Sequence, residues 1–175
     1  MIEKIAIRES VPGDVASFEK LYRDAFPDED LLPLVRELQG EGPAVVSLVA
    51  IADKALVGHV AFTTCGIVGS AKKVALLGPL AVAPARQRQG IGSLIVREGL
   101  RWLKNADMNQ VYVLGDPAYY SRFGFEPEDR VTPPYQLPQE WRGAWQSLDL
   151  GNDKQPLHGM LSVPPPWRKR ALWTS

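Results

Sequence analysis

Residues 77–95 have the sequence LGPLAVAPARQRQGIGSLI, and they decide the fold of this chain. They overlap an apolar run at 73–82, which is typical of a buried strand. Gly78 and Pro79 interrupt that run. Because proline removes a ladder hydrogen bond, we expect the strand to bend or to part from its neighbour there. Apolar residues then recur at helical spacing over 91–103. The stretch therefore predicts a strand, a short loop and a helix in succession.

The loop between that strand and helix, QRQGIGS at 87–93, is suited to an anion. Its glycines let the backbone approach a ligand, and a helix N-terminus offers free N–H groups with a partial positive charge. Two standard phosphate motifs do not fit, because the dinucleotide fingerprint needs a third glycine and the P-loop needs Gly-Lys-Ser/Thr. On the local pattern alone, a strand–helix turn without a ligand stays open as the alternative.

Periodicity and turn residues predict further elements on both sides of this stretch. Asp14 is the expected N-cap of the first helix, and Asp53-Lys54 is a link of hairpin length between two strands. Residues 126–143 are expected to be loop, and 164–175, with three consecutive prolines, an extended or loosely ordered tail. The expected strands are 3–8, 44–52, 55–65, 73–82, 110–115, 144–150 and 157–163, the last two around a Gly151-Asn152-Asp153 turn, and the expected helices run from Asp14 to about Pro27 and over 28–39, 91–103 and 117–123.

Length and charge bound the class of protein. The chain has 175 residues and a formal net charge of zero. This length suggests one domain, expected over 1–163 with the tail after it. The neutral charge argues against a surface built to bind nucleic acid, and no apolar run reaches the length of a membrane span. Cys65, the single cysteine, excludes an internal disulfide, and the N-terminal MIEKIAIRES has no signal-peptide core. We therefore expect a soluble, cytoplasmic protein.

A second motif, GDPAYYSRFGFEP at 115–127, completes a family pattern. The two motifs together resemble the GCN5-related N-acetyltransferases (GNAT), and among them the YhbS-like predicted N-acetyltransferases. Gln87-x-x-Gly90-x-Gly92 matches the acyl-CoA pyrophosphate loop of that family, and 120–125 matches its Y-x-x-x-G-F signature. The resemblance implies an α/β fold with a mixed, mostly antiparallel sheet of about six to seven strands, splayed at the bulged fourth strand and flanked by about four helices.

By the same resemblance, acetyl-CoA is the acyl donor and binds where the sheet opens near Val82. Its pantetheine arm is expected to pair with the backbone at 80–82, and its pyrophosphate to accept N–H bonds from 87–93. No metal is implied, and no spacing of Cys, His and carboxylates suggests one. The residues implied in acyl-CoA binding are Leu80, Ala81, Val82, Gln87, Arg88, Gln89, Gly90, Ile91, Gly92, Ser93 and, on the CoA side or in packing, Tyr119.

Amine acetylation needs a neutral amine, donors for the oxyanion and a proton for the departing thiolate. By resemblance, Tyr120 is the general acid, and its alternative role is an aromatic ring packed against Phe123 or Phe125. Tyr119 points about 100° away from Tyr120 on a helix, so both tyrosines are not expected to reach one thiol.

No residue stands out as the general base. Relatives often carry a carboxylate on the bulged strand, and VALLGPLAV at 74–82 has none. His59 is a weak candidate because imidazole titrates near physiological pH, and a hydrogen-bonded strand histidine is the simpler alternative. Glu29 and Asp30, in the region that usually shapes the acceptor site, could act through water or be solvated helix charges. Asp116 is a further weak candidate, for which an N-cap role is simpler.

The remaining chemical groups leave alternatives open. Arg86 and Arg88 could pair with CoA phosphates or be exposed loop charges. Cys65 is expected to be a buried strand residue. Four tryptophans of the last third could line an acceptor pocket or an interface, with core and tail packing as the default: Trp141, Trp145, Trp167 and Trp173.

We predict direct transfer of an acetyl group from acetyl-CoA to a primary amine of a small molecule or a protein, through a ternary complex, by a monomer or homodimer. The alternative is a non-catalytic acyl-CoA-binding or sensing module, which the missing strand carboxylate keeps open.

Overall fold

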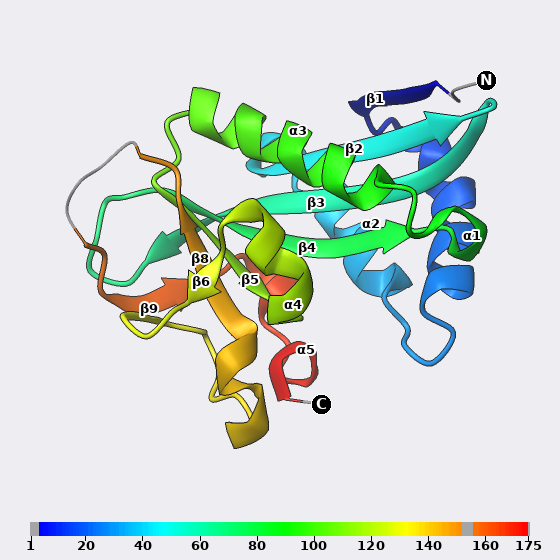
Figure 1. The fold of residues 1–175 in the computed structure, drawn as a ribbon. Helices are drawn as coiled ribbons and strands as arrows, with labels where there is room; N and C mark the ends of the chain where they lie inside the picture. Colours follow the sequence, from blue (N-terminus) through cyan, green and yellow to red (C-terminus); the bar gives the residue numbers. More distant parts are fainter. Residues whose placement is uncertain (1–3, 152–155, 175) are drawn as a thin grey trace. The chain divides into compact units, whose positions relative to one another are not determined.

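The computed structural model describes residues 4–151 and 156–174 (Figure 1). These residues belong to two compact units. The first unit comprises Met1–Phe62 and Gly78–Arg101, and the second comprises Thr63–Leu77 and Trp102–Ser175. The expected turn at Asn152-Asp153 lies outside the described residues. In the described part of the chain, no helix has the length and apolar character needed to cross a membrane.

The first unit contains consecutive neighbouring strands. β1 and β2 pair antiparallel, and β2, β3 and β4 follow as neighbours. Asp53 and Lys54 form the predicted two-residue link between β2 and β3, both with positive φ (50° and 65°), as in the turns that match strand twist. The elements are β1 (Ile5–Glu9), α1 (Val15–Ala25), α2 (Leu32–Gln39), β2 (Val45–Ala52), β3 (Ala55–Ile67), β4 (Val74–Val82) and α3 (Ile91–Asn105), of which β3, β4 and α3 continue into the second unit.

Helices cover both faces of these strands because successive strand residues point to opposite sides. Val49 of β2 packs with Tyr22 of α1 in one core cluster. Its neighbour Ala50 faces α3 instead: a Cβ at Gly58 of β3 would lie 3.4 Å from the Ala50 Cβ and 3.2 Å from Cγ2 of Ile91. The view in Figure 1 agrees, with α3 in front of the strands and α1 and α2 behind them.

The second unit is built around β5. β5 pairs parallel with β4 over Ala75–Leu77 and antiparallel with β8, and β8 also pairs with β6. The pairing of β4 with β5 stops before Gly78, as Pro79 predicts. β9 pairs with the end of β3 and with β7. The elements are β5 (Gln110–Leu114), α4 (Pro117–Tyr120), β6 (Glu126–Pro127), β7 (Val131–Thr132), β8 (Trp145–Asp149), β9 (Gly159–Ser162) and α5 (Ala171–Thr174).

The observed sheet pairing is mixed and mostly antiparallel, as predicted, but the described residues contain nine strands rather than six or seven. Two of the additional strands, β6 and β7, are two residues long and lie in the stretch expected to be loop. Pairs this short carry no periodicity that a sequence reading can detect. The two strands expected around the Gly151 turn do not pair with each other, since β8 pairs with β5 and β6 and β9 pairs with β3 and β7.

Two local predictions are wrong. The tail is not loosely ordered: Trp167 and Trp173 are buried, the Trp167 Nε1–H donates to the Thr63 Oγ1 at 3.1 Å, and the Trp173 Nε1–H donates to the Trp167 carbonyl at 3.0 Å. Asp14 occupies the N-cap position of α1, as predicted, but the expected capping bond is wrong, because its carboxylate accepts no N–H of that helix. It binds the Arg8 guanidinium at 2.9 and 3.0 Å and the Val11 N–H at 2.8 Å.

Candidate functional site

The loop between β4 and α3 is exposed from Gln87 to Gly90. Its backbone turns through the left-handed region at Arg88 (φ 65°) and Gly90 (φ 82°). A Cβ at Gly90 would meet nothing within 4 Å, so the requirement for glycine comes from the backbone conformation rather than from lack of space. The loop is therefore a shaped turn that stays accessible to a ligand.

The N-terminus of α3 supplies hydrogen-bond donors at the end of this loop. The first N–H groups of a helix have no carbonyl one turn earlier to bind. The Leu94 N–H binds the Gly90 carbonyl at 3.0 Å, so the N–H groups that precede it, on Ile91, Gly92 and Ser93, belong to the first turn. Ser93 is half-buried, and Ile91 and Gly92 are buried. Together with the positive end of the helix dipole, this arrangement favours an anion.

Two glutamines hold the loop in shape. The Gln87 Nε2–H donates to the Val82 carbonyl at 3.0 Å, and the Gln89 Nε2–H donates to the Ala85 carbonyl at 3.3 Å. Both side chains therefore brace the turn from within the same segment. A ligand would meet the backbone of the loop first.

The two loop arginines differ. Arg86 forms an ion pair with Asp53 at 3.3 Å. The Arg88 guanidinium has no ion-pair partner among residues 4–151 and 156–174, and the residue is exposed. Of the two, Arg88 is the cation whose charge is open to a phosphate.

The last residues of β4 adjoin the loop. Ala81 is buried in the core beneath α1 and α2, while Leu80 and Val82 are half-buried. The side chain of Ala81 is thus unavailable to a ligand, and only its backbone remains. Sequence reasoning missed Gly58, whose lack of a side chain lets Ile91 seat the start of α3 on β3. A glycine inside a strand pattern was the signal for such a close approach.

Tyr120 lies in the second unit, at the end of α4. Its ring packs edge-on against Phe125 at 5.8 Å and lies over Gly115, where a Cβ would come within 2.4 Å of it. Burial raises the pKa of its hydroxyl above the ordinary value of 10, so the group stays protonated at neutral pH. No described residue hydrogen-bonds that hydroxyl. Tyr120 is therefore both packed and equipped to donate a proton.

The neighbours of Tyr120 have structural roles. The Arg122 guanidinium lies 4.2 Å from the ring centre of Tyr119. The Asp116 carboxylate accepts the Ala118 N–H at 2.9 Å, which confirms its N-cap role at α4.

Cys65 is buried as predicted, and burial raises the pKa of its thiol to about 12, so it is a poor nucleophile.

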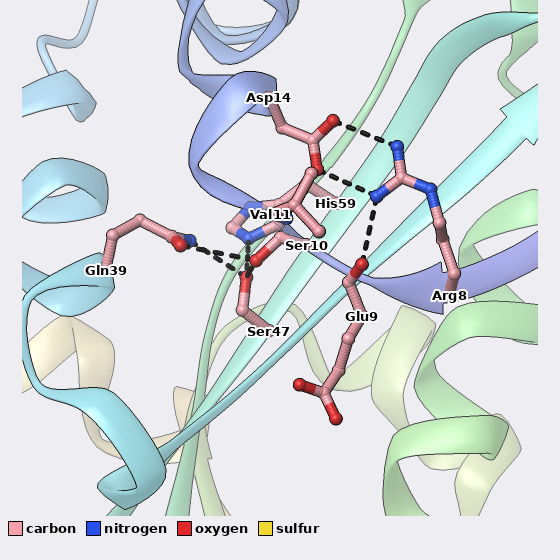
Figure 2. A network of polar contacts seen from close by, with 8 residues as sticks. All are labelled: Arg8, Glu9, Ser10, Val11, Asp14, Gln39, Ser47 and His59. Carbon is pink, nitrogen blue, oxygen red and sulfur yellow. Dashed lines mark hydrogen bonds and ion pairs between the residues drawn. The ribbon is translucent and has the colours of Figure 1, made fainter.

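His59 sits in a closed polar network between β3 and α1 (Figure 2). Its Nδ1 lies 2.6 Å from the Tyr22 hydroxyl oxygen and its Nε2 lies 2.8 Å from Ser47 Oγ, so the neutral ring donates at one nitrogen and accepts at the other. Ser47 Oγ also accepts from Gln39 at 3.0 Å and lies 2.8 Å from Ser10 Oγ. The ring is 1% exposed.

Burial lowers the pKa of His59 to about 3, and the charge of Asp14 opposes this shift only in part. Asp14 is itself held ionised, because its hydrogen bonds from Arg8 lower the pKa of the carboxyl. The imidazole is therefore neutral at physiological pH with both nitrogens occupied. This geometry matches the hydrogen-bonded strand histidine better than a base that accepts a proton from an amine.

Glu29 and Asp30 lie between α1 and α2 and not on a helix, since α2 begins only at Leu32. They line a cavity of about 330 Å³ whose wall also contains Phe26 and Leu31. Asp28 and Arg23 line it as well, so the pocket has three carboxylates and one guanidinium beside apolar side chains, and it can hold a cationic amine. In the described part of the chain, no group of three or more His, Cys, Asp or Glu side chains is arranged to hold a metal ion.

Known relatives match this architecture along the chain. The Acetyltransferase (GNAT) family profile matches residues 15–125, which is more than half of the chain. A protein named "Uncharacterized N-acetyltransferase YjhQ" from Escherichia coli K12 is 33% identical over 168 residues, covering 91% of this chain and 92% of YjhQ. The N-acetyltransferase YhbS of the same strain is 36% identical over 121 residues, covering 69% of this chain and 72% of YhbS.

Solved structures give the same result. The crystal structure of YhbS from Escherichia coli in complex with CoA superposes with a TM-score of 0.86 and 28% identity, covering 97% of this chain and 94% of that one. A GNAT acetyltransferase from Brucella melitensis in complex with acetyl-CoA gives 0.76 and 30%, covering 94% and 98%. These matches confirm the predicted fold class. The chain belongs to the GNAT acetyltransferase family.

Proposed function

We propose that this chain transfers an acetyl group from acetyl-CoA directly to a primary amine of a small molecule or a protein. The observation that carries the proposal is the exposed turn at 87–90 that leads into the N-terminus of α3. Its Gln87-x-x-Gly90-x-Gly92 sequence resembles the family's pyrophosphate loop, which supports this assignment. The two similar crystal structures contain CoA and acetyl-CoA, which supports acetyl-CoA as the donor here.

In this proposal the pyrophosphate accepts N–H bonds from 87–93, and the pantetheine arm lies along the backbone of 80–82. Arg88 adds an open positive charge beside the phosphates. The Gln87 and Gln89 side chains hold the turn, and Tyr119 contributes through packing around Arg122. Acetyl-CoA is a substrate, and no metal takes part.

The chemical step needs a proton at the leaving sulfur. The amine nitrogen attacks the thioester carbonyl and gives one proton to a base. The C–S bond breaks, the CoA thiolate takes the proton of the Tyr120 hydroxyl, and the tyrosinate regains a proton from solvent. The Tyr120 hydroxyl carries a proton at neutral pH and no described residue hydrogen-bonds it, so that proton is available to the sulfur. For the base, Glu29 and Asp30 are better placed than His59, because they line an open cavity while both His59 nitrogens are hydrogen-bonded.

Calorimetric titration with acetyl-CoA and CoA tests the donor site. We expect micromolar binding by the wild type and its loss in the Gly90→Val/Gly92→Val double variant. If the folded wild type binds neither compound, the proposal is wrong.

Turnover with a panel of primary amines tests the reaction. Removing a general acid slows a reaction by about 10²–10⁴-fold, so we expect a fall of that order in kcat for Tyr120→Phe with the Kd of CoA unchanged. Binding without turnover of any amine would favour the non-catalytic acyl-CoA module, which is the second candidate because β4 carries no carboxylate.

Three further assignments belong to this proposal. We infer a cytoplasmic protein, supported by the buried, unpaired Cys65. A nucleic acid partner is not expected for a chain with zero formal charge. The assembly is a monomer or a homodimer, and size-exclusion chromatography with light scattering distinguishes the two.

A further inference from the structure

A second cavity lies wholly in the second unit, along the stretch from β6 to β8. Its volume is about 760 Å³. Sites for small molecules typically measure about 300–1,000 Å³, so this cavity has the size of a ligand pocket. It is lined by residues of 127–145 together with Met160 of β9.

The rim of this cavity is held by a set of hydrogen bonds, of which the one from Trp145 is buried. The Glu128 carboxylate accepts the N–H groups of Arg130 and Val131 and the Ser147 hydroxyl, each at 2.7 Å. The Trp145 Nε1–H donates to the Val131 carbonyl at 2.8 Å. These bonds fix the backbone at 128–131 and occupy both oxygens of the Glu128 carboxylate. The pocket is therefore preformed, which lowers the entropic cost of binding.

The wall is largely apolar. Met160 is 46% exposed at this wall, although an apolar side chain of that size is normally buried. Trp145 forms part of the buried wall and stacks on Tyr112 with 5.5 Å between ring centres. The apolar lining includes Val131, Pro133, Pro134, Leu137, Trp145 and Met160.

Two open charges of opposite sign share this wall. Arg142 and Asp129 both line the cavity and both are exposed. Neither side chain forms an ion pair or hydrogen bond with another residue of the described chain. A guanidinium recognises a carboxylate through two parallel hydrogen bonds, and an Asp carboxylate accepts from an ammonium group.

We propose that this cavity binds a free α-amino acid with a large apolar side chain. Arg142 pairs with its carboxylate, Asp129 accepts from its ammonium group, and the apolar wall buries its side chain. A zwitterion satisfies both open charges, whereas an acid or an amine alone leaves one of them unused. The assignment does not depend on acetyl transfer.

Calorimetric titration of the full chain with L-phenylalanine and L-tryptophan tests this site. 3-Phenylpropionate, which lacks the ammonium group, and phenethylamine, which lacks the carboxylate, are the matched probes. We expect both amino acids to bind and both probes to bind at least tenfold more weakly. Arg142→Gln should weaken L-phenylalanine at least tenfold, and Asp129→Asn should weaken L-phenylalanine but leave 3-phenylpropionate unchanged. Arg130→Gln, an exposed arginine outside the lining, is the control and should bind as the wild type does.

Three outcomes would overturn the proposal. They are failure of both amino acids to bind folded wild-type protein, unchanged binding in Arg142→Gln, and equal affinity for phenethylamine and L-phenylalanine. Acetyl-CoA is titrated into the same preparation. Acetyl-CoA binding without amino acid binding would overturn this site alone, and the reverse would leave this site standing while contradicting the proposed acetyl donor.

Discussion

The loop before α3 and the network around His59 are both polar, and both belong to the first unit. They differ in whether their polar groups face solvent or are bonded inside the protein. From Gln87 to Gly90 the chain is exposed, and this exposed turn leads directly into the first turn of α3. Around His59 both ring nitrogens are hydrogen-bonded inside the protein, and the ring is 1% exposed. The contrast teaches that polar groups satisfied inside the fold stabilise it, while those left open are the ones that a ligand can use.

Removing the closed network should have the largest effect. His59→Leu deletes the partner of the buried Tyr22 hydroxyl and one partner of Ser47. An unsatisfied buried polar group costs about 1–3 kcal/mol, so we expect the free energy of unfolding to fall by about 3 kcal/mol in urea denaturation. The Kd of acetyl-CoA should not change.

His158→Leu is the matched control, because His158 is exposed, and its effect should stay within about 0.5 kcal/mol. The contrast between an open, ligand-binding loop and a closed, structural network would be wrong if a folded His59→Gln variant lost acetyl transfer while keeping its stability. That result would make His59 the general base.

Acid should destabilise the closed network next. The pKa of His59 is about 3 in the folded protein and ordinarily 6.5, so between these values the unfolded state binds a proton that the folded state does not. Stability is therefore present above pH 6.5 and decreases as the pH falls, by about 1.4 kcal/mol per pH unit. Urea titrations between pH 6 and pH 4 measure this slope. The window lies above the ordinary Asp14 pKa of 3.8, which the folded state lowers further. A slope unchanged in His59→Leu would contradict the assignment.

The open loop should respond in ligand affinity. Gly90→Val puts a β-branched residue at φ 82°, which costs about 1–2 kcal/mol of backbone strain and distorts the turn. We expect acetyl-CoA to bind about 30-fold more weakly, which is about 2 kcal/mol. Gly69 has the same φ of 82° and equally open surroundings, so Gly69→Val is a matched control for strain. It should lose similar stability and keep the wild-type Kd, and equal weakening in the two variants would refute a loop-specific role.

The smallest effect should come from the side chains that brace the loop. Gln87→Ala removes the 3.0 Å bond to Val82, and Gln89→Ala removes the longer 3.3 Å bond to Ala85. A hydrogen bond of this kind contributes about 0.5–1.5 kcal/mol, so we expect Gln87→Ala to weaken acetyl-CoA by about two- to fivefold, and Gln89→Ala by less. If Gln89→Ala weakened acetyl-CoA binding more than Gln87→Ala, the ranking of the two hydrogen bonds would be wrong.

Local chemistry determined much of this protein from its sequence. The strand–loop–helix order around 77–95, the hairpin at Asp53-Lys54 and the Asp116 cap of α4 all appeared where expected. Each depends on backbone preferences and hydrogen bonds within a few residues, which composition and spacing record directly. The family followed from two such motifs in order. The places of 87–93 between β4 and α3, and of Tyr120 at the end of α4, were predictable for the same reason.

Tertiary structure decided what each polar or aromatic side chain does once folded. Asp14 was expected to cap α1 and binds Arg8 instead, His59 is bonded on both nitrogens, and Trp167 reaches Thr63 across 104 residues. The cavity between β6 and β8 likewise comes from pairings of two residues each, which have no sequence signature. Such contacts depend on which distant segments of the chain meet. The sequence pattern does not say which segments these are, because the same side chain is compatible with several partners until the strands are paired.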